Sequence, residues 1–162
     1  LPYTIIRPFN CVGIGEDNED NKEYGTSHVI PDIINKILDN KDGFINVFGD
    51  GEQIRHFTHG NDIARAVRMS IENENAVNED FNIASSEGIT INKLVDKILF
   101  FCNKHNDIKK RYVQSFPYDV KRRIPSIEKA KNKLGFVASI SLDESLKEAV
   151  NYEIRKRNVK ND

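Results

Sequence analysis

Apolar residues along this chain recur at two spacings, and the spacing changes from one segment to the next. Short apolar or alternating runs, which predict strands, occupy residues 3–7, 44–48, 54–58, 81–84 and 111–114. Segments with apolar side chains three or four positions apart, which predict helices, occupy residues 28–38, 61–70, 90–99, 126–135 and 142–156. Strands and helices therefore alternate, and this order predicts an α/β domain with parallel strand pairing.

Polar residues and one glycine mark where the predicted helices begin and end. Asn61 or Asp62 is expected to cap the helix that follows the strand at 54–58, and Thr90 to cap the next helix. Ser141 opens a Ser-x-x-Glu capping box for the last helix, while Gly135 is expected to end the short helix before it.

The composition predicts about one soluble domain with a modest core. The 24 Lys and Arg residues are balanced by 25 Asp and Glu, so the net charge does not favour a nucleic-acid partner. The two cysteines form no metal or redox spacing. No apolar run reaches the ~18 residues of a membrane span, and no signal-like segment opens the chain. These features favour a cytoplasmic setting with no membrane partner.

Leu1 leads directly into the strand predicted at 3–7, with no methionine before it. An apolar, β-branched run of this kind is typical of a buried parallel strand, which has neighbours that cover it. We therefore expect the 162 residues to be a piece of a longer chain.

A Gly-Asp-Gly turn at 49–51 is followed by a predicted strand that carries Arg55. A guanidinium group binds phosphate oxygens through two parallel hydrogen bonds and stays charged, so Arg55 is a candidate anion-binding residue. A surface ion pair is the structural alternative for this side chain.

Five segments carry recognisable motifs. They are Arg-Pro-Phe-Asn-x-x-Gly at 7–13, Val-Ile-Pro at 29–31, Gly-Asp-Gly-x-Gln-x-Arg at 49–55, Phe-Asn-Ile-Ala at 81–84, and Tyr-Asp-x-x-Arg-Arg through Leu-Gly-Phe at 118–136. In this order they resemble the extended short-chain dehydrogenase/reductases, which are NAD-dependent nucleotide-sugar epimerases and dehydratases. Each motif alone has low specificity, but together they span nearly the whole chain.

The resemblance implies the C-terminal part of an extended Rossmann-type epimerase: the last core strand or strands plus the small α/β substrate-binding domain. The family's Gly-x-x-Gly-x-x-Gly cofactor loop and Tyr-x-x-x-Lys catalytic helix both precede the position of Leu1. An N-terminal cofactor-binding portion is therefore expected as the missing partner of residues 1–162.

The resemblance also implies a function for the parent enzyme, an isomerase or lyase of carbohydrate metabolism that is typically a homodimer. The missing tyrosine takes a proton from the sugar while NAD accepts hydride from sugar C4, which gives a keto sugar. The present residues are expected to recognise the nucleotide sugar and to lack catalysis alone, so no catalytic residue is assigned. The identity of the nucleotide sugar, and the choice between epimerase, dehydratase and decarboxylase, stay open.

Ligand contacts follow from the same resemblance. Pro8 is expected near the nicotinamide and is the assigned cofactor-binding residue. The assigned substrate-binding residues are Asn10, Val29, Ile30, Arg55 and Arg122. Asn10 and Arg55 are expected on the diphosphate, the backbone at 29–30 along the base, and Arg122 on either. The structural alternatives are a local turn at Asn10, core packing at 29–30 and a solvated basic run at 121–123.

Some residues depart from the family pattern or invite other interpretations. His56 stands where the family usually has Asp, Gly60 where Val is common, and Phe116 where many members have an Arg. His56 and His59 are expected to face opposite sides of a strand, which argues against a metal site. Tyr152 and Lys156 form a Tyr-x-x-x-Lys, but it lies after the final capping box and is interpreted as a surface pair.

The acidic run at 16–23 is interpreted as a solvated, mobile loop at the lip of the sugar pocket. Two other functions remain possible at this stage: a nucleotide-sugar-binding module without chemistry, and part of a reductase of the same fold that acts on a different substrate.

Overall fold

The computed structural model describes residues 1–15 and 28–161, so the acidic run at 16–23 lies outside the described residues. The chain forms two compact units, and each is assembled from three separate stretches of sequence. The first unit contains Leu1–Val12, Ile54–Ile89 and Arg122–Leu142, and the second contains Gly13–Gln53, Thr90–Lys121 and Asp143–Asp162.

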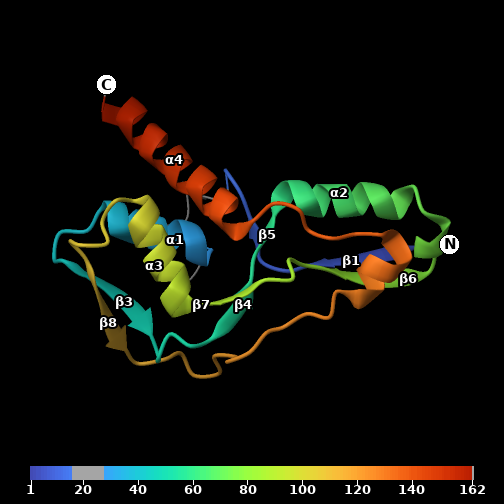
Figure 1. Cartoon of the computed structure of the whole chain (residues 1–162), viewed down its shortest axis with the longest axis horizontal. Helices are drawn as coiled ribbons and strands as arrows, with labels where there is room; N and C mark the ends of the chain where they lie inside the picture. Colours follow the sequence, from blue (N-terminus) through green and yellow to red (C-terminus); the bar gives the residue numbers. More distant parts are fainter. Residues whose placement is uncertain (16–27, 162) are drawn as a thin grey trace. The chain divides into compact units, whose positions relative to one another are not determined.

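A pair of parallel strands forms the centre of the first unit. Strand β1 (Thr4–Pro8) pairs with β6 (Glu79–Ile83), with Thr4 opposite Glu79 and Pro8 opposite Ile83. Helix α2 (Gly60–Ile71) runs along this pair (Figure 1). The parallel pairing expected from the alternation of elements is confirmed.

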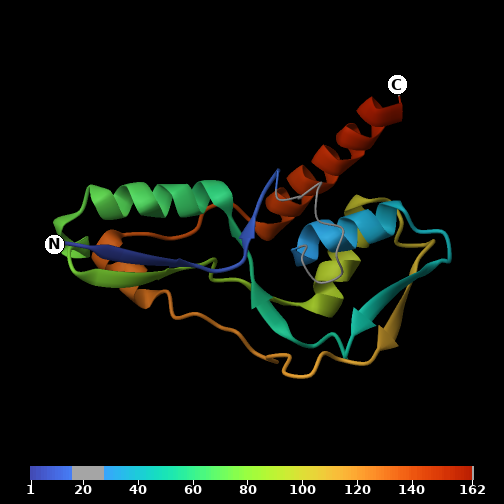
Figure 2. The same cartoon turned by 180° about the vertical axis from the view of Figure 1, so that it is seen from behind.

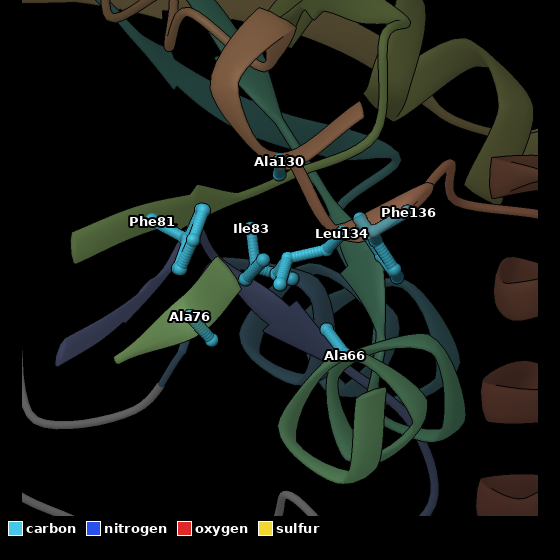
Figure 3. Close-up of a cluster of buried hydrophobic side chains, with 7 residues drawn as sticks. All are labelled: Ala66, Ala76, Phe81, Ile83, Ala130, Leu134 and Phe136. Atoms are coloured by element: carbon cyan, nitrogen blue, oxygen red, sulfur yellow. The ribbon is translucent and has the colours of Figure 1, made fainter. Parts of the chain in front are cut away.

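The core of the first unit lies between β6, α2 and two short helical turns. The turns are η1 (Glu74–Ala76), a 3-10 turn, and η2 (Ala130–Leu134), a π turn. Figure 3 shows the buried side chains that meet there: Ala66, Ala76, Phe81, Ile83, Ala130, Leu134 and Phe136. The helix predicted at 126–135 is thus shorter than expected, but it ends at Gly135, whose φ of 69° is left-handed as a C-terminal glycine requires.

Four very short strands complete the first unit. The strand predicted at 54–58 is divided at Phe57 into β4 (Ile54–His56) and β5 (Thr58–His59). Strand β4 pairs with β7 (Gly88–Thr90), and β5 pairs in parallel with β2 (Cys11–Val12). Strands of two or three residues are too short to show a hydrophobic period, which is why β2 and β7 were not predicted.

The predicted cap of α2 is wrong. The residue before the helix is His59, whose ring nitrogen accepts a hydrogen bond from the backbone N–H of Asn61 at 3.2 Å. Gly60 is the first helical residue, so Asn61 and Asp62 both lie inside the first turn. The Asp62 carboxylate is almost fully buried and binds another segment of the chain instead.

Among the residues that the structure describes, the second unit contains a second parallel strand pair and three helices. Strand β3 (Phe44–Phe48) pairs with β8 (Lys109–Val113), and helix α1 (Val29–Leu38) contacts α3 (Ile91–Phe101) (Figure 2). The predicted cap of α3 is confirmed, because the Thr90 hydroxyl accepts the Lys93 N–H at 3.3 Å. Helix α4 (Leu142–Asn161) extends beyond its predicted end.

Arg157, in that added stretch of α4, donates to the side chains of Asn35, at 2.7 Å, and Asp39.

No helix among the described residues combines the length and the apolar character that crossing a membrane requires.

Candidate functional site

The site begins where β1 and β6 end. Pro8 and Ile83 are opposite one another at the carboxyl ends of two parallel strands, and the Phe9 N–H donates to the Ile83 carbonyl at 3.0 Å. Ligands of α/β proteins bind beyond this end of a parallel sheet, where the loops leave the strands. Pro8 itself is exposed, and the loop that follows it carries Asn10.

Asn10 ties the loop after β1 to strands β4 and β5. Its side-chain amide donates to the His56 carbonyl at 2.7 Å, and its own carbonyl accepts the Thr58 N–H at 3.0 Å. Its φ of 32° is positive, a conformation that asparagine tolerates better than most residues. One of the two amide hydrogens is therefore used to position this loop.

Ser85 makes the equivalent tie for the loop after β6. Its N–H donates to the Thr58 hydroxyl at 3.0 Å, and its carbonyl lies 2.9 Å from His56 Nδ1. Because a carbonyl oxygen only accepts, His56 carries a hydrogen on Nδ1 in this arrangement. Both loops at the carboxyl edge are thus held by the same short stretch, residues 56–58.

His56 and His59 have structural roles in this arrangement. Both side chains are buried, and the His59 ring accepts the Asn61 N–H at the start of α2. Within residues 1–15 and 28–161, no group of three or more His, Cys, Asp or Glu side chains could hold a metal ion. The departure at His56 therefore supplies a buried hydrogen bond to the loop after β6.

Gly88, on β7, gives the His56 ring its space. A Cβ atom at Gly88 would lie 2.9 Å from His56 Nε2 and 3.0 Å from Ile54 Cγ2. We expect Gly88→Ala to lower the free energy of unfolding by about 1–3 kcal/mol, because the buried ring is held by Ser85 and cannot turn aside. Urea denaturation of the purified chain measures this change.

Gly60→Ala is the matched control for this prediction, since its Cβ would meet the nearest atoms at 3.7 Å, an ordinary contact. Equal stability of the two variants would contradict the role given to Gly88.

Arg55 lies on β4, between Ile54 and His56. His56 is buried, Arg55 is partly exposed, and successive side chains of a strand point to opposite faces. The Arg55 Nη1 donates to the Ile54 carbonyl at 2.9 Å, so the guanidinium lies back along its own strand.

The basic pair at 122–123 joins the same strand. Arg122 forms a parallel bridge with Ile54, and the Arg123 N–H donates to the Ile54 carbonyl at 3.4 Å. Both arginine side chains are exposed. Three of the six residues singled out from the sequence, Asn10, Arg55 and Arg122, therefore have their backbone or side chain on or beside β4.

Val29 and Ile30 belong to the second unit, in the first turn of α1. Val29 is 38% exposed, whereas Ile30 is 2% exposed and packs in the core. At Ile30 the side chain is therefore committed to packing, and the backbone is the part of the residue that remains for a ligand.

Sequence reasoning missed Thr58 and Ser85, which hold the loops of the site. The signals for their role are their positions: Thr58 is the first residue of β5, separated from β4 by Phe57, and Ser85 directly follows Ile83 and Ala84. Neither residue belongs to a motif with a recognised chemistry, so the pairing across the sheet was needed to identify them.

Comparisons with known proteins identify the family of the chain. The model of the NAD dependent epimerase/dehydratase family matches residues 1–84. A protein of Methanocaldococcus jannaschii, described as a putative UDP-glucose 4-epimerase, is 33% identical over 155 residues, which is 94% of this chain and 46% of that protein. A UDP-N-acetyl-alpha-D-glucosaminuronate decarboxylase of Bacillus cytotoxicus is 29% identical over 157 residues, again 94% of this chain and 46% of that protein.

Solved structures of epimerases also match the chain. The UDP-glucose 4-epimerase of Thermotoga maritima, determined with UDP-glucose, superposes with a TM-score of 0.83 at 30% identity, covering 97% of this chain and 47% of that one. A UDP-N-acetylglucosamine 4-epimerase from Methanobrevibacter ruminantium, in complex with UDP-N-acetylmuramic acid, has a TM-score of 0.81 at 30% identity, covering 96% and 47%. The chain therefore spans about half the length of the relatives it matches.

Proposed function

The chain belongs to the NAD-dependent epimerase/dehydratase family, and we propose that its residues recognise the nucleotide-sugar substrate of an epimerase or dehydratase of that family. The relatives are named for UDP-sugars, and two of the solved structures contain UDP-glucose or UDP-N-acetylmuramic acid. UDP-sugars are therefore the substrates to test first.

The arrangement around β4 is the observation that carries this proposal. Arg55 lies on β4, Arg122 is bridged to that strand through its backbone, and the Asn10 side chain donates to the His56 carbonyl of the same strand. Guanidinium groups bind the planar oxygen pairs of phosphate, and this grip retains its charge at any physiological pH. We assign the diphosphate to Arg55 and Arg122, with Asn10 holding the loop beside them.

The proposed contacts of the nucleotide base and of the cofactor rest on the family resemblance. Val29 and the backbone of Ile30 remain the proposed contacts of the nucleotide base, and Pro8 the proposed contact of the nicotinamide. The residues present do not fit NAD as a complete site. Among the described residues, no atom lies within 4 Å of the position that a Cβ of Gly13 or Gly15 would take, so this glycine pair lines no cradle for a pyrophosphate. In the other close pair, Gly49 and Gly51, a Cβ on Gly51 would lie 2.3 Å from the Asn92 side chain, so that space is already filled.

The proposed role is therefore binding and orientation. Holding a substrate in its reacting geometry is a large part of catalysis, but it transfers neither proton nor hydride. The proton acceptor and most of the NAD contacts are assigned to the portion of the family fold that lies outside residues 1–162. The parent enzyme, proposed as a homodimeric isomerase or lyase, would join both portions.

Isothermal titration of the chain with UDP-glucose, UDP and pyrophosphate tests the proposal. We expect heat of binding with all three ligands, because the phosphates supply the charge that Arg55 and Arg122 recognise. An incubation of the chain with NAD and UDP-glucose should give no turnover. No binding of UDP-glucose or UDP would contradict the proposed recognition, and measurable turnover would contradict the absence of catalysis.

A further inference from the structure

Four hydrogen bonds of the first unit form a closed circuit through Asn10, His56, Ser85 and Thr58. The Asn10 amide donates to the His56 carbonyl at 2.7 Å, and the His56 ring donates from Nδ1 to the Ser85 carbonyl at 2.9 Å. The Ser85 N–H donates to the Thr58 hydroxyl at 3.0 Å, and the Thr58 N–H donates to the Asn10 carbonyl at 3.0 Å. The circuit therefore joins the loop after β1, the stretch from β4 to β5 and the loop after β6.

The middle of this circuit is shielded from water. His56 is 5% exposed and Thr58 is 1% exposed. Hydrogen bonds in such surroundings polarise one another, and a buried polar group that loses its partner is costly. The loss of one bond is therefore expected to weaken the rest of the circuit.

Asn10 depends on the circuit for its backbone conformation. Its φ of 32° is strained for a residue with a Cβ, and a strained residue persists only where its surroundings fix it. Both its side-chain amide and its carbonyl belong to the circuit. The circuit is therefore what holds the loop after β1 in place.

The circuit closes only if the side chain at position 56 is a hydrogen-bond donor. The Ser85 carbonyl accepts hydrogen bonds and cannot donate them, so the hydrogen between the two groups belongs to the His56 ring. The family resemblance predicts Asp at this position, and an ionised carboxylate also only accepts. An aspartate facing the Ser85 carbonyl would place two acceptors together, so this chain requires a donor where its relatives have an acid.

We propose that His56 is a positioning residue of the nucleotide-sugar site, whose ring closes the circuit that holds Asn10 beside the diphosphate. This inference rests on the proposed function, because that function supplies the diphosphate. His56 acts through Asn10 and contacts no ligand itself. A change of the side chain at position 56 should therefore weaken diphosphate binding although Arg55 and Arg122 are unaltered.

His56→Asn and His56→Asp test the inference as a matched pair, since the two new side chains have the same size and shape. Asparagine offers an N–H close to the position of the ring Nδ1, so this variant should bind UDP within about threefold of the wild type. Aspartate offers only acceptors, so the dissociation constants of UDP and pyrophosphate should both rise by about tenfold in calorimetry. Equal affinities of the two variants for UDP would overturn the inference.

A double-mutant cycle separates positioning from a general loss of stability. In an Asn10→Ala background, His56→Asp should change the affinity for UDP little, because the residue through which His56 acts is gone. An undiminished effect of His56→Asp in that background would overturn the inference. Phe81→Leu, a core change in the same unit, is the control: it should lower stability in urea and bind UDP as the wild type does.

Thr58→Val tests the circuit at a second position and decides the matter if His56→Asp does not fold. Valine resembles threonine in shape but leaves the Ser85 N–H without its acceptor, so the dissociation constant of UDP should rise by about threefold to tenfold. A wild-type chain that binds neither UDP nor UDP-glucose overturns both this inference and the proposed function. A wild-type chain that binds UDP, together with unchanged binding by Thr58→Val, overturns only the positioning role.

Discussion

Arg55→Ala is expected to weaken the binding of UDP by about tenfold to a hundredfold. A hydrogen bond to a charged group contributes about 1.5–3 kcal/mol, and each 1.4 kcal/mol is a factor of ten in the dissociation constant. Arg55 is partly exposed and bonds within its own strand to the Ile54 carbonyl. The side chain can therefore be removed without opening the core, and the loss should appear in binding while the free energy of unfolding changes little.

Two further variants sharpen the test. Arg55→Lys keeps the charge but loses the planar pair of donors, so its affinity for UDP should fall between those of the wild type and Arg55→Ala. Arg68→Ala removes an exposed arginine of α2 from the same unit and should leave UDP binding unchanged. If Arg55→Ala binds UDP as the wild type does, Arg55 is a surface residue and the diphosphate assignment is wrong.

The long elements of the fold were predictable because each shows a full period of apolar positions. The strand at 44–48 and the helices at 29–38 and 91–101 lie within a few residues of the predicted ranges. The start of α2 was not predictable in the same way. Asn61 and Asp62 both have the side chains of a cap, but the chain places Asp62 in the core, where its partners come from residues 139 and 140.

The candidate site, like the fold, was predictable from the sequence only in part. Asn10, Arg55 and Arg122 were identified from motifs, because each carries a chemistry that suits phosphate. The hydrogen bonds that hold the loops of the site were not predictable from the sequence, because Asn10 and His56 are 46 residues apart and Ser85 and Thr58 are 27 residues apart. Bonds of this kind depend on which strands become neighbours. Local patterns record the spacing within an element and not the neighbours of that element.

Asp62→Asn is expected to lower the free energy of unfolding by about 3 kcal/mol, because it disrupts a buried, fully bonded carboxylate. Asp62 accepts hydrogen bonds from the Ser139 and Ile140 N–H groups, each at 2.9 Å, and from the Arg65 guanidinium at 2.6 Å. An asparagine would turn an NH₂ group toward donors that need an acceptor. Urea denaturation measures the loss, and Glu128→Gln, an exposed change in the same unit, should alter stability by less than about 0.5 kcal/mol.

The effect of Asp62 should depend on pH in a defined direction. Burial raises the pKa of the Asp62 carboxyl, but the hydrogen bonds from Ile140, Arg65 and Ser139 outweigh burial and hold the pKa below its usual value. A lowered pKa in the folded state stabilises the fold above the unfolded pKa of about 3.9, and this contribution is lost as pH falls through the folded value. The stability difference between wild type and Asp62→Asn should therefore be constant from about pH 7 to pH 5 and shrink below about pH 4. A difference that grows as pH falls would mean that the carboxylate is destabilising where it lies, and that the hydrogen bonds do not compensate for its burial.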